Sequence, residues 1–305
     1  MADVSVIILT HNEEKHIARC LQSLHPFTDK IFIVDSFSTD RTVDIARSLG
    51  ATVVQNPWIN YAIQFNYGIE NTPFKTSWLM RMDADEYVLP ELAEEINQHL
   101  TTLSDDVSGI YIKRRVLFFD KWIRHGDYYP IWLLRLWRRQ QGICEETWMD
   151  EHIKLSQGKS IQFQHDLVDH NLNDLTWWTQ KHNNYAIREV IDLLNIKYNF
   201  DKTQRVEPKL FGSQEQRTRY LKIQYASLPL FTRPFLYFFY RYFFRLGFLD
   251  GKKGLIWHFL QGLWYRFLVD AKMFEVYFHA GRDKESIIQF FRTHYGKDLS
   301  PTNRP

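Results

Sequence analysis

The stretch VSVIILTHNEE, residues 4–14, begins as an apolar run and ends in a polar turn. A short apolar run bounded by polar residues predicts a strand that is buried on both faces. The runs at 31–34 and 78–82 have the same character. Apolar residues at helical spacing fill the intervals 13–24 and 43–49. Strands and helices that alternate in this way predict an α/β fold with a mostly parallel sheet and helices on both faces.

Polar groups follow three of the predicted strands at the point where each strand ends. The sequence there is THNE at 10–13, DSFSTD at 35–40 and DADE at 83–86. Ligands of open α/β sheets bind beyond the carboxyl ends of the strands. The sequence therefore predicts that these three segments share one site.

Asp83 and Asp85 are two residues apart, directly after a buried strand. If the chain stays extended there, both carboxylates lie on one side, where their repulsion favours a bound cation. Oxygen ligands of this kind prefer Mg²⁺ or Mn²⁺, and such an ion takes up charge on a leaving diphosphate. The alternative is a solvated loop whose acids cap the helix predicted at 90–100.

Asp35 follows the apolar run IFIV and precedes a turn that is rich in Ser and Thr. Its carboxylate can accept hydrogen bonds from a nucleobase imide or from a ribose hydroxyl. The alternative is a turn or a helix cap, which is common for Asp and Ser. Thr39 and Asp40 are predicted to cap the helix that begins near Arg41.

The composition of the 305 residues is that of a globular protein, with 45% apolar and 24% charged residues. A net charge of +2 argues against a nucleic-acid-binding protein, and two cysteines, Cys20 and Cys144, do not make a disulfide framework. We expect the start of the chain to be a first strand and not a signal peptide, and no apolar run reaches the roughly 18 residues of a membrane span. We expect a protein of the cytoplasm or of the cytoplasmic face of a membrane.

The segments VSVIILTHNEE, IVDSFSTDRT and MRMDADE together resemble the donor half of an inverting family 2 glycosyltransferase with the GT-A fold. The likeness continues in YAIQFNYGIE, KWIRHGDYYPIWLLRLWRR and TWMDEHI. Later, RLGFLDGKKGLIWHFL resembles the tail of one subgroup, which includes the lipopolysaccharide core β-1,4-glucosyltransferases. The resemblance covers nearly the whole chain and implies a Rossmann-like GT-A sheet.

The resemblance also implies a role for each matching residue of the donor site. It places the nucleobase against residues 10–13 and uracil at Asp35, and it makes Asp85 the direct ligand of Mg²⁺ or Mn²⁺. Asp83 lies at the metal or at the ribose. The implied donor-binding set is Thr10, His11, Asn12, Glu13, Asp35, Asn66 and Asp83.

Inversion at a sugar carbon is a single in-line displacement, which needs one base for the proton of the acceptor hydroxyl. The segment WMDEHI holds two candidates, and the resemblance aligns Glu151 with the family's acid. Asp150 stands where relatives usually have His, so it remains the alternative base. Both acids can also cap a helix or pair with Arg135 or Arg138.

Two further groups concern the metal and the acceptor. His170 follows a predicted strand, and in several GT-A enzymes a late His completes the metal site. Arg124, His125 and Arg135 are predicted to bind an anionic acceptor such as a phosphorylated sugar or a lipid diphosphate. The alternative for this stretch, 113–139, is a β-hairpin that packs the catalytic domain together.

The composition changes after about residue 205, and we predict a catalytic domain over 1–205 and a helical tail over 206–305. Residues 209–253 contain nine Lys and Arg residues but only two acidic residues. Arg241 and Arg245 share one helical face within a region full of Phe and Tyr. Amphipathic helices of this kind lie in the interface of an anionic membrane. The alternative is a helical subdomain packed on the core or forming a dimer.

These observations favour a transferase that moves a sugar, glucose as the first expectation, from a UDP-sugar to a lipopolysaccharide core or another lipid-linked glycan. We expect it at the inner face of the cytoplasmic membrane. One alternative is a catalytically silent, membrane-bound scaffold that binds nucleotide sugars. The other is a sugar nucleotidyltransferase, which the absence of Gly from 10–15 disfavours.

Overall fold

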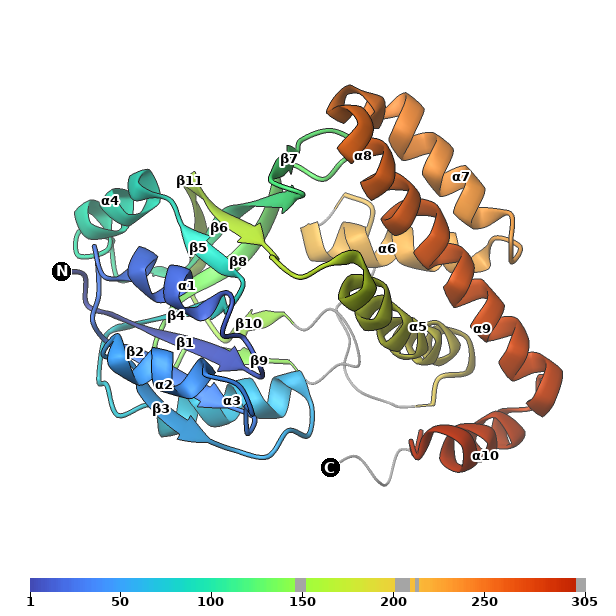
Figure 1. The fold of residues 1–305 in the computed structure, drawn as a ribbon, viewed down its shortest axis with the longest axis horizontal. Coiled ribbons are helices and arrows are strands. Elements are labelled where there is room, and N and C mark those ends of the chain that lie inside the picture. The colour runs from blue at the N-terminus through green and yellow to red at the C-terminus, as the bar shows by residue number, and fades with distance from the viewer. Residues whose placement is uncertain (146–151, 201–208, 212–213, 300–305) are drawn as a thin grey trace. The chain divides into compact units, whose positions relative to one another are not determined.

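The fold is described from a computed structural model, over residues 1–145, 152–200, 209–211 and 214–299. The chain forms two compact units, shown in Figure 1. Unit 1 comprises Met1–Asn173 together with Gly247–Gly254, and unit 2 comprises Asp174–Leu246 and the residues from Leu255 onward. Each unit is considered by itself below.

Unit 1 is built on one large sheet with the strand order β3-β2-β1-β4-β8-β6-β11-β5, and β7 pairs with β6. The pairs among β3, β2, β1 and β4 are parallel, as is β6 with β11, whereas β8 is antiparallel to both β4 and β6. The strands are β1 (Val4–Thr10), β2 (Ile31–Asp35), β3 (Thr52–Gln55), β4 (Trp78–Asp83), β5 (Glu86–Val88), β6 (Val107–Phe118), β7 (Lys121–Ile123), β8 (Ile131–Arg138) and β11 (Lys159–His170). A separate ribbon pairs β9 (Gly142–Cys144) with β10 (Ile153–Leu155).

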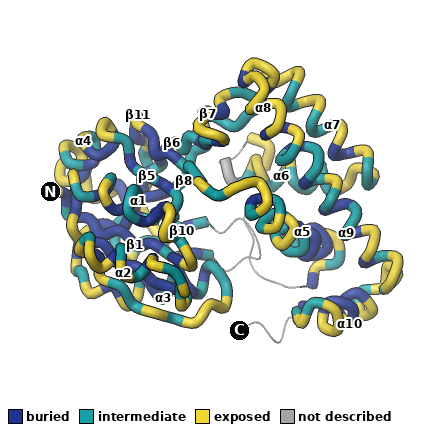
Figure 2. The backbone as a smooth tube through the Cα atoms, viewed as in Figure 1, coloured by how far each residue is buried: buried dark blue, intermediate teal, exposed yellow. Residues whose placement is uncertain are grey.

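Helices cover both faces of the parallel half of this sheet. Val4, Val6 and Ile8 of β1 share a buried cluster with helices α1 (Ile17–Leu24), α2 (Thr42–Ser48) and α4 (Pro90–His99). Ile7, which alternates with them, packs in a second cluster with α3 (Tyr61–Asn71). Because successive residues of a strand point to opposite faces, a run that is apolar at both registers needs cover on both sides. The predicted α/β class is confirmed, and buried strands appear dark blue in Figure 2.

Unit 2 is helical, as predicted for the C-terminal region. Its elements are α5 (Leu175–Tyr198), α6 (Gln214–Ser227), α7 (Arg233–Phe239), η1 (Tyr240–Phe244), η3 (His258–Trp264), α9 (Tyr265–Ala280) and α10 (Lys284–Tyr295), with the later residues of α8 (Gly251–Trp257). A buried ion pair joins Arg233 to Asp270 at 2.5 Å. Within the described parts of the chain, no helix is both long and apolar enough to cross a membrane.

The division between the units differs from the predicted boundary at 205. Glu189 of α5 accepts contacts from Lys222 and from Arg266, which lie on α6 and α9. These ion pairs hold α5 in the helical unit, so unit 1 ends at Asn173. In the opposite sense, the short helix η2 (Gly247–Asp250) and the first residues of α8 belong to unit 1, although they lie within the predicted tail.

Candidate functional site

The three polar strand ends meet at one edge of the sheet. In the parallel register, Thr10 of β1 lies beside Asp35 of β2, and Leu9 lies beside Asp83 of β4. The adjacency that the sequence predicted is therefore present. Helix α4 starts after Leu89, whose side chain makes no capping hydrogen bond, so the alternative that Asp83 and Asp85 cap this helix is wrong.

Asp35 is fully buried and accepts four hydrogen bonds from its own chain. Its Oδ1 accepts from Thr10 Oγ1 at 2.8 Å and from Ser38 Oγ at 2.5 Å. Its Oδ2 accepts from the Ser38 amide at 2.9 Å and from Gln55 Nε2 at 3.1 Å. Burial alone raises the pKa of Asp35, but the hydrogen bonds from Ser38, Gln55 and Thr10 outweigh it and hold this pKa below its ordinary value. The carboxylate thus fixes the turn that follows β2.

The loop after β1 is joined to this turn by Asn12 and His11. The Asn12 amide donates to Ser38 Oγ at 2.9 Å, and Asn12 Oδ1 accepts from the Thr39 amide at 2.8 Å. Asn12 has a φ of 57°, in the left-handed region that Asn tolerates better than most residues. His11 is exposed, and its Nδ1 lies 2.9 Å from the Ser36 carbonyl oxygen. His11 and Asn12 are both exposed, so solvent and a ligand can reach this loop.

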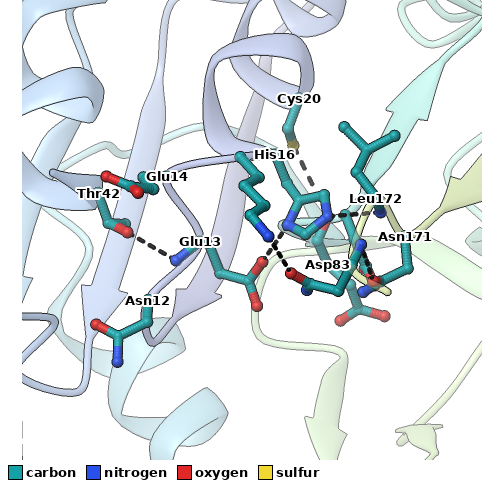
Figure 3. A network of polar contacts seen from close by, with 12 residues as sticks. Asn12, Glu13, Glu14, His16, Cys20, Thr42, Asp83, Asn171 and Leu172 are labelled. Atoms are coloured by element: carbon teal, nitrogen blue, oxygen red, sulfur yellow. Dashed lines mark hydrogen bonds and ion pairs between the residues drawn. The ribbon is translucent and has the colours of Figure 1, made fainter. Parts of the chain in front are cut away.

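Glu13 connects the loop after β1 to the end of β11 through a buried histidine (Figure 3). The Glu13 carboxylate lies 2.6 Å from His16 Nδ1, and His16 Nε2 accepts from the Leu172 amide at 2.9 Å. Because Nε2 is an acceptor, the proton of the neutral ring is on Nδ1 and is donated to Glu13. Glu13 therefore orients His16, which in turn holds the chain just beyond β11.

Asp83 is paired with positive and phenolic groups rather than with the other acids. Its Oδ1 accepts from Tyr61 Oη at 3.0 Å, and its Oδ2 accepts from Arg135 Nη2 at 3.2 Å. Burial raises the pKa of Asp83, but the guanidiniums of Arg135 and Arg81 outweigh burial and hold this pKa far below its ordinary value. Asp83 is thus a carboxylate, and both of its oxygens already have partners in the protein.

The same arginine holds a second, more deeply buried acid. Arg135 Nη2 lies 2.5 Å from Glu86 Oε1, and the Asp83 amide donates to Glu86 Oε2 at 3.0 Å. Burial, reinforced by Asp83 and opposed by Arg135, holds the pKa of Glu86 above its ordinary value. Arg135 was predicted to bind the acceptor, but the structure places it with these acids because β8 pairs directly with β4. Neither Glu86 nor Tyr61 was singled out from the sequence.

Asp85 faces the end of β11. Its Oδ2 accepts from Asn171 Nδ2 at 3.0 Å, while its Oδ1 makes no hydrogen bond within the described residues. His170, the predicted third metal ligand, uses both ring nitrogens. Its Nδ1 accepts from Arg19 Nη1 at 3.0 Å, and its Nε2 lies 2.9 Å from Asp120.

The fit of a divalent cation follows from these contacts. Across the described residues, no three His, Cys, Asp or Glu side chains are grouped so that they can hold an ion. Asp85 offers one oxygen that has no hydrogen-bond partner among the residues the structure describes, whereas Asp83 and His170 are engaged by Arg135 and Arg19. The donor set therefore suits an ion that takes one ligand from Asp85 and the others from a bound molecule such as a diphosphate.

Asn66 holds the strand that leads to the predicted base. Its Nδ2 donates to the Cys144 carbonyl at 2.9 Å, and its Oδ1 accepts from the Cys144 amide at 3.0 Å. This reciprocal pair fixes β9 against α3. Asp150 and Glu151, the two candidate bases, lie outside the described residues.

The predicted acceptor residues Arg124 and His125 follow β7. The Arg124 guanidinium lies 4.5 Å from the centre of the Trp122 ring, and Arg115 lies 4.3 Å from the same ring. His125 Nδ1 is 2.8 Å from Asp250 of η2. Arg115 is also paired with Asp166, so Trp122 gives this region an aromatic surface and the Arg124 guanidinium gives it positive charge.

Comparison with known proteins agrees with this arrangement. Residues 5–155 match glycosyl transferase family 2. An uncharacterized glycosyltransferase of Rickettsia typhi is 29% identical over 268 residues, which cover 84% of this chain and 82% of that protein. An uncharacterized glycosyltransferase of Rickettsia bellii is 40% identical over 103 residues, 34% of each chain.

Among solved structures, similarity extends over most of the chain at low sequence identity. A mannosyltransferase of Pyrobaculum calidifontis, in complex with GDP-Man and Mn²⁺, is 14% identical with a TM-score of 0.48, over 90% of this chain and 87% of that one. TarS of S. aureus, in complex with UDP-GlcNAc, is 13% identical with a TM-score of 0.46, over 95% and 91%.

Proposed function

The protein is a glycosyltransferase whose residues 5–155 match glycosyl transferase family 2, and from this premise we propose that it transfers a sugar from a UDP-sugar with inversion. The observation that carries this proposal is the edge of the sheet at which Thr10 lies beside Asp35 and the adjacent Leu9 lies beside Asp83. Ligands of parallel sheets bind at this edge. Because the matches are to glycosyltransferases, they give no support to the alternatives of a silent scaffold or a sugar nucleotidyltransferase.

The donor is proposed to lie across the ends of β1, β2 and β4. The nucleobase is placed against the loop of His11 and Asn12, whose shape is fixed by the Asp35 turn. Asp35 already accepts four hydrogen bonds within the protein. Its proposed contribution to donor binding is therefore its negative charge and the position it gives to Ser38, in addition to the direct contact with uracil that the resemblance implies. Glucose remains the first expectation for the sugar, on the resemblance alone.

Mg²⁺ or Mn²⁺ is proposed as the cofactor, with Asp85 as the protein ligand. When bound, the ion neutralises charge that develops on the departing diphosphate. Arg135 keeps Asp83 ionised beside this position, and Asn171 orients the Asp85 carboxylate. These residues are therefore proposed to set the charge and the geometry of the site before the donor arrives.

Glu151 is proposed as the base, with Asp150 as the alternative. The base takes the proton of the acceptor hydroxyl while that oxygen attacks the sugar carbon and the bond to the diphosphate breaks. We expect Glu151→Gln to leave UDP binding unchanged and to stop transfer. Normal turnover of this variant would transfer the role to Asp150.

The acceptor is proposed to be a lipopolysaccharide core or another lipid-linked glycan, bound while the enzyme rests on an anionic membrane. The support is an apolar strip on α7 and η1 of unit 2, visible as exposed positions in Figure 2. Its large exposed side chains are Phe235, Leu236, Phe239, Tyr240, Phe243 and Phe244. Their spacing by one and three residues puts them on one side of a continuous helix. Arg245, also exposed, follows the strip and adds attraction to anionic lipid.

The donor is tested by calorimetric titration with UDP, GDP and CMP, each with and without Mn²⁺. Binding of UDP alone, and only with Mn²⁺, is the expected result, and Asp85→Ala should abolish it. Binding of GDP or CMP in preference to UDP would reject the proposed donor. Binding of none of the three would reject the donor site itself.

The membrane surface is tested by sedimentation with vesicles of phosphatidylcholine and phosphatidylglycerol. Removing the whole tail is unsuitable because Gly247–Gly254 is part of unit 1. We therefore expect the pair Phe239→Ser and Phe243→Ser to release the protein, and Phe211→Ser, an exposed control outside the strip, to leave it bound. Equal sedimentation of both variants would reject the strip as the membrane surface.

A further inference from the structure

The segment Gly247–Gly254, with the sequence GFLDGKKG, is the part of the predicted tail that belongs to unit 1. Phe248 and Leu249 are exposed, whereas the side chain of Asp250 between them and the following glycine is only 2% exposed. A buried carboxylate costs free energy unless it is paired or hydrogen-bonded. The contacts of Asp250 therefore show what this segment holds.

Asp250 binds the loop that carries the predicted acceptor residues. Its Oδ2 accepts from the backbone amides of Arg124 at 3.1 Å and His125 at 3.0 Å. Its Oδ1 lies 2.8 Å from His125 Nδ1. One carboxylate thus fixes the backbone at two successive residues and the direction of the imidazole ring at the second.

A second contact fixes the other end of β7. Lys253 Nζ donates to the Phe119 carbonyl at 2.5 Å, in the turn between β6 and β7. Asp250 and Lys253 therefore hold the β6–β7–loop unit before and after the three residues of β7. Neither contact involves a residue of the donor site.

The local backbone is built so that Asp250 can point inward. Gly251 has a φ of 70°, which favours glycine and turns the chain from η2 into α8. A side chain at position 254 would overlap the Cβ of Asp250, so Gly254 allows α8 to pass close to it. The two glycines serve the placement of this one carboxylate.

The loop held by Asp250 presents the groups that suit an anionic sugar. Arg124 stacks on Trp122, and Tyr129 meets the same Trp edge-on with ring centres 4.9 Å apart. Because the backbone of Arg124 and His125 is fixed, the guanidinium and the imidazole are already close to a single conformation. Less conformational entropy is then lost when they bind a ligand.

We infer that Asp250 is a positioning residue for the acceptor: it holds Arg124 and His125 in the conformation that binds an anionic glycan. This inference rests on the proposed function, in which that loop receives the acceptor. It predicts a separation of effects. Loss of Asp250 weakens acceptor binding, while the donor site keeps its affinity because the hydrogen bonds removed are those to Arg124 and His125.

The test compares Asp250→Asn and Lys253→Met in the full chain with two matched controls. Asp105→Asn removes an exposed acid elsewhere in unit 1, and Lys252→Met removes the exposed neighbour of Lys253. Hydrogen–deuterium exchange is measured over residues 119–130, and UDP binding with Mn²⁺ is measured by calorimetry. Kinetics use UDP-[¹⁴C]glucose with heptose-terminated lipopolysaccharide as the acceptor probe.

We expect exchange over 119–130 to rise about tenfold or more in Asp250→Asn, since charge-assisted hydrogen bonds are lost. A smaller rise is expected in Lys253→Met and none in the controls. The acceptor KM should rise by about tenfold in Asp250→Asn, with a smaller change in kcat and with UDP affinity within about twofold of wild type. A merely structural defect would lower UDP affinity and kcat as well.

The remaining outcomes of the exchange and kinetic measurements also test the role of Asp250. Unchanged exchange in Asp250→Asn overturns it, as does faster exchange with an unchanged acceptor KM. If Asp250→Asn fails to fold, Lys253→Met decides by the same two measurements, because it removes only a surface contact. If the wild type binds UDP but transfers no label, the acceptor of the proposed function is wrong, and unchanged exchange would still overturn the role of Asp250.

Discussion

The burial of Asp35 leads to a prediction about stability that is independent of the substrate. We consider Asp35→Asn, which keeps the shape of the side chain and removes its charge. In the wild type, four donors point at the two carboxylate oxygens, at 2.5 to 3.1 Å. An Asn amide satisfies the Ser38 amide and Gln55 only if its NH₂ faces the hydroxyls of Thr10 and Ser38, which must then rotate to accept.

The expected cost follows from the loss of charge at these bonds. Hydrogen bonds to an ionised group contribute about 1.5–3 kcal/mol, against about 1 kcal/mol for neutral ones. Four bonds lose this difference, and the lower desolvation cost of a neutral side chain offsets part of it. We therefore expect a loss of about 2–3 kcal/mol in the free energy of unfolding at pH 7.

Urea denaturation followed by tryptophan fluorescence measures this loss. With a slope of about 2–3 kcal/mol/M, the midpoint should fall by about 1 M. The exposed Asp44→Asn on α2 is the matched control and should stay within about 0.5 kcal/mol of wild type.

The pH dependence supplies a second criterion for Asp35. A carboxyl whose pKa is lowered by folding stabilises the protein fully above its unfolded pKa of about 3.9. That stabilisation disappears as the pH falls through the lower, folded value. The difference between wild type and Asp35→Asn should therefore shrink below pH 4. A difference under about 0.5 kcal/mol at pH 7, or one that stays constant down to pH 2, would refute this account of the Asp35 turn.

Three further predictions concern other parts of the structure. Asn66→Ala removes two hydrogen bonds to the backbone of Cys144 and should lower the free energy of unfolding by about 1–3 kcal/mol in urea denaturation. An unaffected variant would show that β9 is held by other contacts. Arg135→Met removes the guanidinium that Glu86 and Asp83 share and should lower the free energy of unfolding by about 3–5 kcal/mol. The double variant with Glu86→Gln should recover part of this loss, and strictly additive losses would contradict the pairing. Burial lowers the pKa of His182 in unit 2 to about 4. Because the unfolded chain then binds a proton that the folded chain does not, the free energy of unfolding of the wild type should fall by about 3 kcal/mol as the pH falls from 6.5 to 4. The melting temperature of His182→Phe should vary less over this range.

Several features were determined by the sequence alone. The apolar runs at 4–9, 31–34 and 78–82 fixed the parallel half of the sheet, because strands buried on both faces need helices on both sides. The same pattern predicted that the groups following β1, β2 and β4 meet at one edge, as their register shows. These inferences succeed because each functional group is adjacent in sequence to the strand that positions it.

The tertiary structure decided which partners those groups have. Arg135 lies on β8, and the pairing of β8 with β4 brings it to Asp83 and Glu86 instead of the loop of Arg124 and His125. Asp250 reaches the amides of Arg124 and His125 across 126 and 125 positions of sequence. Local periodicity reports which face of an element is buried, but it carries no information on the distant segment that packs there. The edge proposed to bind the donor was therefore predictable from strand ends. The residues that hold this edge and the loop proposed to bind the acceptor could be identified only in the folded chain.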